Sequence, residues 1–213
     1  MATLRLVVLV SGRGSNMRAI ATAIEEGRLD AEIVGVFSDK QFAPALDIAR
    51  DHGIPAFWVN PRDYANRLEF DRALFAHVDA LNPDVIVCAG FMRIMSAEVV
   101  RVRSDRMINI HPSLLPKFKG LHTHRSAIEA GETEHGASVH ILTEDLDGGP
   151  VLMQGRVSVH PGDTEESLAE RVLQVEHELL VTTLNEWQKG HFKFHSPQLL
   201  YRGEVLEYPL QLR

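Results

Sequence analysis

The sequence predicts an α/β fold built on a doubly wound, mostly parallel sheet, with an antiparallel extension at the C-terminus. Short apolar runs rich in β-branched residues alternate with amphipathic segments, which is typical of buried parallel strands joined by helices. The chain has 213 residues, of which 45% are hydrophobic and 24% are charged. This length and composition suit one large globular domain with a substantial core.

The first half of the chain alternates regularly between strand and helix patterns. Residues 4–10 are rich in leucine and valine, as expected of a buried strand. A helical pattern from Met17 to Glu26 ends at Gly27, a residue that commonly terminates helices. By the same criteria we expect strands at 31–37, 54–59 and 84–89, and helices at 44–52 and 62–81, the last with Leu68, Phe70, Leu74, Phe75 and Val78 towards the core.

The second half has fewer helices and more turn residues. Pro112 ends an apolar strand, because proline cannot continue a central strand. The sequence LDGGP at 146–150 predicts a tight turn between two antiparallel strands, and Thr164 is a typical first residue of a helix. We therefore expect strands at 107–110, 138–144 and 151–159, a helix from 164 to about 187, and a β-ribbon or an ordered tail at 189–213.

The loop after the first strand, SGRGSN at 11–16, has the features of a phosphate site. It stands between a buried strand and a helix, so its backbone N–H groups and the positive end of the helix dipole meet at one point. Met17 occupies the position of the third glycine in a G-x-G-x-x-G motif, which favours a monophosphate over a dinucleotide. A tight turn without a ligand explains the same residues.

Asn109, His111 and Asp147 are the main candidates for catalysis. Residues two apart on a strand point to the same face, so Asn109 and His111 leave the end of their strand together. The turn at 146–150 can return the Asp147 carboxylate to this rim. An amide and a protonated imidazole stabilise an oxyanion, and a neighbouring carboxylate favours the protonated imidazole, so this set suits acyl chemistry.

Other interpretations of these residues stay open. An Asn-x-His-Pro sequence is most often turn chemistry with a satisfied histidine, and His122 with His124 could chelate a metal, although the chain has no cysteine cluster and no H-E-x-x-H motif. Ser113 lacks the G-x-S-x-G context of a nucleophile, and Cys88 lies inside an apolar run. The sequence therefore favours direct transfer without a covalent enzyme intermediate.

Composition narrows the classes of partner. A formal net charge of −7 argues against a general nucleic-acid binder, and a single cysteine excludes an internal disulfide. The apolar run near the N-terminus is too short for a membrane span and leads into a glycine turn rather than a cleavage site. We expect a cytoplasmic protein that acts on small molecules, without nucleic-acid or membrane partners.

Four motifs in order resemble the folate-dependent formyltransferases, and within them the phosphoribosylglycinamide formyltransferase (GAR transformylase) family. They are SGRGSN at 11–16, AGFMRIM at 89–95, NIHPSLLPKFKGLHTH at 109–124, and HGASVH through LDGGP at 135–150. The resemblance implies a single Rossmann-like formyltransferase domain over 1–213, with a nucleotide- and phosphate-binding half at 1–105, a catalytic and folate-binding half at 106–188, and a C-terminal tail at 189–213.

By this resemblance, the formyl group of 10-formyltetrahydrofolate is transferred to the amine of 5′-phosphoribosylglycinamide in de novo purine biosynthesis. The amine attacks directly and a tetrahedral intermediate forms. The resemblance implies no metal, and a monomer or a weak homodimer. The residues that it implies are Asn109, His111 and Asp147 for catalysis; Gly14, Ser15, Asn16 and Glu176 for phosphoribosylglycinamide; and Arg67, Met92, Arg93, Ile94, Met95, Glu144, Asp145 and Leu146 for folate.

Two positions depart from the family pattern, and three related functions are to be distinguished. Leu173 stands where some members carry a polar residue near the phosphate, and Leu180-Val181 replaces a Tyr-Pro pair.

Methionyl-tRNA formyltransferase shares the block around Asn109 but carries a further tRNA domain, for which we expect no room here. Formyltetrahydrofolate hydrolase normally has an additional N-terminal domain. A nucleotide-binding module without catalysis would depend on the 11–16 loop alone.

Overall fold

Strand β1 (Leu4–Val10) organises the first half of the fold in the computed structural model, which describes residues 2–213. It pairs in parallel with β2 (Ala31–Ser38) on one side and with β4 (Val85–Cys88) on the other. Its side chains alternate between two apolar clusters, because Leu6 and Val8 enter one and Val7 and Leu9 enter the other. A strand buried on both faces is apolar almost throughout, and this explains the continuous run in the sequence.

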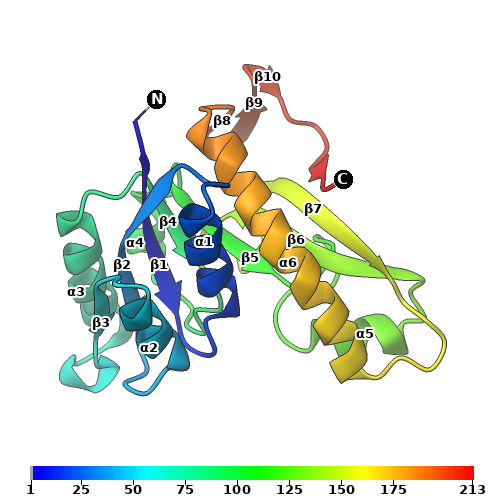
Figure 1. Cartoon of the computed structure of the whole chain (residues 1–213), viewed down its shortest axis with the longest axis horizontal. Coiled ribbons are helices and arrows are strands. Elements are labelled where there is room, and N and C mark those ends of the chain that lie inside the picture. The colour runs from blue at the N-terminus through cyan, green and yellow to red at the C-terminus, as the bar shows by residue number, and fades with distance from the viewer. Residues whose placement is uncertain (1) are drawn as a thin grey trace.

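One sheet of eight strands runs through the molecule in the order β11-β7-β6-β5-β4-β1-β2-β3 (Figure 1). The strands from β3 to β5 along this order are parallel, β6 is antiparallel to β5, and β7 is antiparallel to β6. The remaining bounds are β3 (Ala56–Trp58), β5 (Met107–His111), β6 (Glu134–Ile141), β7 (Val151–Ser158) and β11 (Leu210–Gln211). The predicted α/β fold with a mostly parallel sheet is confirmed.

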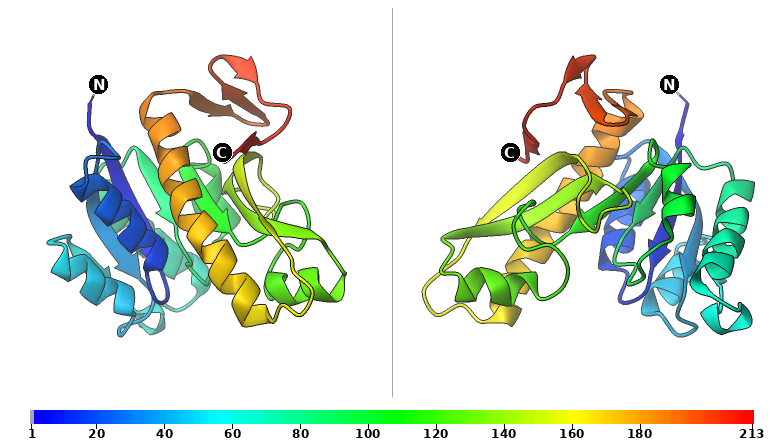
Figure 2. Two further views of the ribbon diagram at one scale, coloured as in Figure 1. Left: turned by 45° about the vertical axis from the view of Figure 1, so that its right-hand side comes forward. Right: turned by 180° about the vertical axis from the view of Figure 1, so that it is seen from behind.

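Helices cover both faces of the sheet (Figures 1 and 2). Side chains of α1, α2 and α6 pack in one apolar cluster, and those of α3 and α4 pack in the other on the opposite face. The long α6 contacts β6, β7 and α1, so it joins the two halves of the molecule. The helices are α1 (Ser15–Glu25), α2 (Pro44–Asp51), α3 (Arg67–Ala80), α4 (Ala97–Arg101), α5 (Thr123–Glu129) and α6 (Glu165–Gln188).

The last 25 residues form a small sheet and then return to the large one. Strands β8 (Phe192–His195), β9 (Gln198–Tyr201) and β10 (Glu204–Val205) are antiparallel and lie beyond the end of α6 (Figure 2). Strand β11 then pairs in parallel with β7 at the edge of the main sheet. The antiparallel extension was predicted from the sequence, whereas the return of β11 was not. In the part of the chain that the structure describes, no helix combines the length and the apolar character needed to span a membrane.

Several element boundaries differ from those predicted. The helix expected at 62–81 is a 3₁₀ turn, η1 (Pro61–Asp63), followed by a separate α3, because the Asn66 side chain accepts the Glu69 N–H at 3.0 Å and starts a new helix. The strand expected at 138–144 begins at Glu134, since residues before 138 already pair with β7, and ends at Ile141. Helices α4 and α5 were not predicted, because so few residues show too little periodicity.

Candidate active site

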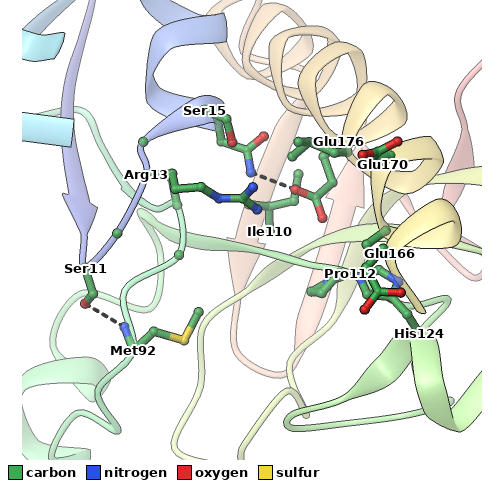
Figure 3. A pocket seen from close by; sticks show the side chains of 17 residues that line it. Ser11, Arg13, Ser15, Met92, Ile110, Pro112, His124, Glu166, Glu170 and Glu176 are labelled. Carbon is green, nitrogen blue, oxygen red and sulfur yellow. Dashed lines mark hydrogen bonds between the residues drawn. The ribbon is translucent and has the colours of Figure 1, made fainter. Parts of the chain in front are cut away.

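A cavity of about 640 Å³, here called the first cavity, opens at the carboxyl ends of β1, β4 and β5 (Figure 3). Ligands of open α/β sheets bind at this edge. Loops after three different strands contribute to it, as predicted, and one face of α6 forms the opposite wall. Its lining consists of Ser11, Gly12, Arg13, Gly14, Ser15, Asn16, Ala89, Gly90, Met92, Ile110, Pro112, His124, Glu166, Ala169, Glu170, Leu173 and Glu176.

The loop between β1 and α1 exposes the N-terminus of a helix to this cavity. Gly14 is the residue before α1 and has a φ of 76°, a conformation that favours glycine. A Cβ at Gly14 would lie 2.5 Å from the Ala45 Cβ, so the loop can press against α2 only with glycine at this position. No side chain caps α1 and its first turn has no acidic residue. The free N–H groups and the helix dipole thus favour an anion at this point.

Asn16 and Glu176 form a buried hydrogen bond across 160 positions of sequence (Figure 3). The Asn16 Nδ2 donates to the Glu176 Oε2 at 2.8 Å, and each residue is 8% exposed. Burial raises the pKa of the Glu176 carboxyl, while the Asn16 hydrogen bond and the charge of Arg13 lower it. The Asn16 Oδ1 is buried without a partner among the described residues. A hydroxyl group of a ligand would satisfy this acceptor, which fits the predicted sugar-binding role.

The three predicted catalytic side chains meet at the end of β5. The His111 Nδ1 lies 3.5 Å from the Asp147 Oδ2, and the His111 Nε2 donates to the Phe118 carbonyl oxygen at 2.9 Å. Asp147 has a φ of 46° in its turn, and its Oδ2 accepts the Gly120 N–H at 2.9 Å. Both His111 nitrogens face acceptors, an arrangement that suits an imidazolium. The turn at 146–150 therefore returns a carboxylate to this rim, as predicted.

His140 is a fourth member of this group that the sequence did not identify as a site residue. It stands directly opposite Asn109 in the β5–β6 ladder, and the Asn109 Nδ2 donates to its Nε2 at 3.0 Å. The His140 Nδ1 donates to the Ile141 carbonyl oxygen, so Nε2 is the acceptor. Burial lowers the His140 pKa to about 4, which keeps the ring neutral at pH 7. A neutral His140 fixes the Asn109 amide with one N–H left for a ligand.

A second cavity of about 130 Å³ adjoins the same side chains on the other side of β5. Asn109 belongs to its lining, whereas its neighbour Ile110 belongs to the lining of the first cavity. Of the predicted catalytic residues, Asn109 and Asp147 line the second cavity, whereas His111 lines neither and lies between Ile110 and Pro112 of the first. The lining of the second cavity consists of Cys88, Phe91, Arg93, Ile94, Met95, Val100, Asn109, His140, Leu142, Thr143, Glu144, Asp145, Leu146 and Asp147.

The structure brings most, but not all, of the predicted folate residues together. Those at 93–95 and 144–146 line the second cavity, whereas Met92 lines the first. Arg67 is exposed at the start of α3 and lines neither cavity. The Arg93 guanidinium lies 4.8 Å above the centre of the Phe70 ring and 3.8 Å from the Asp39 Oδ2. Arg93 thus packs beside Phe70 and Asp39 as a wall of the second cavity.

The structure also places the two departures from the family pattern and the histidines considered as metal ligands. The two departures from the family pattern are both apolar contacts: Leu173 lines the first cavity, and Leu180 and Val181 are buried in the core. The His124 Nδ1 lies 3.2 Å from the His135 Nε2, so His124 pairs with another histidine instead of with His122. Among residues 2–213, no group of three or more His, Cys, Asp or Glu side chains is arranged to hold a metal ion.

An α/β fold with one cavity at a helix N-terminus and a second cavity near the same strand end is typical of a group-transfer enzyme that brings two substrates together. The formyl transferase family matches residues 4–184, and the chain belongs to this family. The matched segment includes β1 to β7 and most of α6, so it covers every residue that lines the two cavities.

The chain is also similar to individual members of that family. Phosphoribosylglycinamide formyltransferase of Escherichia coli (strain K12) is 43% identical over 203 residues, which cover 95% of this chain and 96% of that protein. The trifunctional purine biosynthetic protein adenosine-3 of Homo sapiens is 42% identical over 180 residues, 84% of this chain but 18% of that longer protein. The solved structure of phosphoribosylglycinamide formyltransferase from Coxiella burnetii, in complex with CHES, superposes with a TM-score of 0.94 at 42% identity and covers 99% of both chains.

Proposed function

We propose that this formyl transferase moves the formyl group of 10-formyltetrahydrofolate to the amine of 5′-phosphoribosylglycinamide, a step of de novo purine biosynthesis. The observation that carries the proposal is the grouping of Asn109, His111 and Asp147 at the end of β5, where Asn109 and Asp147 line the second cavity and Ile110 and Pro112 line the first. Relatives that cover 95% and 99% of this chain bear the name of this activity. The first cavity suits a phosphorylated amine, and the second suits the folate.

The two cavities fit these substrates chemically. The uncapped N-terminus of α1 favours the phosphate, and the Asn16 and Glu176 oxygens favour sugar hydroxyls. Ile94, Met95 and Leu146 give the second cavity apolar surface for a flat ring, while its polar edge is formed by Asn109 and acidic residues. We assign Arg93, Ile94, Met95, Glu144, Asp145 and Leu146 to the folate by this reasoning, with Met92 at the boundary of the first cavity.

The catalytic side chains act on the charge that develops during amine attack. The amine adds to the formyl carbon and forms a tetrahedral intermediate, whose oxygen takes up negative charge. Asn109 has one amide N–H free to stabilise that oxygen, since His140 accepts the other. His111 supplies a second donor when its Nε2 leaves the Phe118 carbonyl, and Asp147 stabilises the imidazolium. The proton lost by the amine then passes to the departing folate nitrogen.

The first test is an absorbance assay of 10-formyltetrahydrofolate with and without phosphoribosylglycinamide. We expect turnover only when the nucleotide is present. Loss of one oxyanion donor typically costs about 3 to 4 kcal/mol of transition-state stabilisation, so Asn109→Ala should lower kcat roughly 100-fold or more. Asp147→Asn should also lower kcat, because the imidazolium loses its carboxylate. Asp51→Asn, an exposed change at the end of α2, is the matched control.

Other outcomes of the assay point to other functions. Formate release in the absence of the nucleotide would assign the chain as a formyltetrahydrofolate hydrolase. Binding of the nucleotide without any turnover would assign a nucleotide-binding module instead. Near-wild-type turnover in both folded variants, Asn109→Ala and Asp147→Asn, would remove these residues from the mechanism.

A further inference from the structure

The side chains that line the first cavity carry more negative than positive charge, and none of the residues predicted to bind the substrate there is positively charged. Glu166, Glu170 and Glu176 all line it from α6, and Arg13 is the only lysine or arginine among the described residues of the lining. His124 also lines the cavity, but burial lowers its pKa, so its ring is neutral at pH 7. A phosphate dianion that enters this cavity therefore meets several carboxylates and one permanent positive charge.

The loop directs the Arg13 side chain into the cavity. Arg13 lies between Gly12 and Gly14, and the backbone at Gly14 packs against Ala45 of α2. The guanidinium extends from the loop across the cavity towards Glu176 (Figure 3). Here it lies on the same side as the N-terminus of α1, where Ser15 and Asn16 present their backbone N–H groups. A phosphate at the helix terminus is within the region that this side chain can reach.

The Arg13 guanidinium is also free to bind a ligand. It forms no ion pair with any carboxylate in residues 2–213. Most other arginines of the described chain do form such pairs. Its charge nevertheless acts within the cavity: burial raises the pKa of Glu176, and Arg13 is one of two groups that lower it. An unpaired guanidinium beside an uncapped helix terminus is a suitable site for a phosphoryl group, which it can bind through two parallel N–H groups.

We propose that Arg13 is the specificity residue for the substrate's phosphate, and that it selects phosphoribosylglycinamide over the unphosphorylated ribosylglycinamide. This inference rests on the proposed function, because it names the residue that binds one group of that substrate. Arg13 offsets the repulsion between the phosphate and the glutamates of α6. Its contact is remote from the formyl group, so its loss weakens binding and leaves the chemical step intact.

The experiment compares wild type with Arg13→Gln on both forms of the amine substrate. A hydrogen bond to a charged group corresponds to roughly a 10- to 100-fold change in affinity, so the KM for phosphoribosylglycinamide should rise by that factor in Arg13→Gln. We expect kcat and the KM for 10-formyltetrahydrofolate to stay unchanged. With ribosylglycinamide the two proteins should have equal kcat/KM, because no phosphate is present. Arg13→Lys should recover part of the affinity, since it restores the charge but not the paired N–H groups.

A matched control separates a local effect from a change in net charge. Arg50→Gln removes the same charge from the exposed face of α2, where Arg50 pairs only with Asp47 at the surface, and it should leave every constant unchanged. An unchanged KM for phosphoribosylglycinamide in Arg13→Gln would overturn the proposal. So would an equal loss on ribosylglycinamide, because Arg13 would then act on a group other than the phosphate.

Failure of the proposed function itself has a different signature. If wild type transfers no formyl group, the reaction assigned above is wrong, and the role of Arg13 is measured by binding alone. Inorganic phosphate and phosphoribosylglycinamide should then each raise the Tm of wild type more than that of Arg13→Gln at equal concentration. Equal shifts in both proteins would reject Arg13 as the phosphate residue whatever the reaction is.

Discussion

At the scale of single residues, the proximity of Asn109, His111 and Asp147 was predictable because two of them share a strand end and the third stands in a glycine-marked turn. Asn109 and His111 are two residues apart on one strand, and Asp147 precedes Gly148 and Gly149, where an added Cβ would collide with neighbouring residues. His140 was missed because its role depends on the register between β5 and β6, which sets it opposite Asn109. The bond between Asn16 and Glu176 likewise joins positions 160 residues apart, which no local pattern contains. Glu176 entered the prediction only through the family resemblance.

Buried neutral histidines near the site make stability depend on pH. Burial, with the nearby His124 and His111, lowers the His135 pKa from 6.5 to about 4. Between these values the unfolded chain binds a proton that the folded chain does not, so the free energy of unfolding falls as the pH falls from 6.5 to 4. A shift of this size corresponds to roughly 3 kcal/mol for one ring. His140 should contribute in the same direction, because its pKa is also about 4.

We predict that His135→Gln loses less stability than wild type between pH 7 and pH 4.5. The measurement is urea unfolding at several pH values, with the slope of the unfolding free energy against pH compared between proteins. His77→Gln, on the exposed face of α3, should keep the wild-type slope. If His135→Gln retained the full slope, the acid sensitivity would belong to other groups. Carboxylates in ion pairs, such as Glu186 with a pKa of about 2, act at lower pH.

At the scale of elements, the strands and long helices were predictable because each has a strong period of its own. β1 and β7 were placed within a residue of their observed ends, and α6 began at its predicted cap, Thr164. The break before α3 was missed because hydrophobic periodicity continued through it, while the determining feature was the Asn66 cap. The position of α6 on the sheet depends on one small residue in β7, Gly155, whose role is visible only in the packing.

We predict that Gly155→Ala moves α6 away from the sheet. A Cβ at Gly155 would lie 2.2 Å from the Val175 Cγ1, on the residue that precedes Glu176. Overpacking of this kind costs about 1–3 kcal/mol of stability. The KM for phosphoribosylglycinamide should also rise, because the displaced helix carries Glu176 away from Asn16.

The double variant Gly155→Ala/Val175→Ala tests this explanation. Removing the Val175 methyl groups vacates the space that the new Cβ needs, so the double variant should be more stable than Gly155→Ala alone. Urea unfolding of the four proteins gives the coupling energy directly. Additive losses would mean that Val175 is not the group with which the new side chain collides.

At the scale of the whole molecule, the sequence predicted the sheet but not how its far edge is closed. Strand β11 has two residues, too few for any periodic pattern, and it pairs with β7 more than fifty positions earlier in the chain. Leu210 and Leu212 pack against the core that α6 shares, and the Leu212 N–H donates to the Gln154 carbonyl oxygen at 2.8 Å. Without these residues the edge of β7 would be open to other strands.

Deleting residues 209–213 should therefore reduce stability and solubility while catalysis persists. Loss of two leucine contacts and several hydrogen bonds amounts to a few kcal/mol, which for a chain of this size lowers Tm by about 5 to 10 °C. Residues 209–213 line neither cavity, so kcat/KM below the transition should match wild type. Calorimetry gives the Tm, and light scattering detects association through the open β7 edge. Deletion of Arg213 alone is the control, because Arg213 follows Leu212, the last residue with a backbone hydrogen bond to β7. An unchanged Tm in the longer deletion would show that β11 contributes nothing to the stability of the sheet.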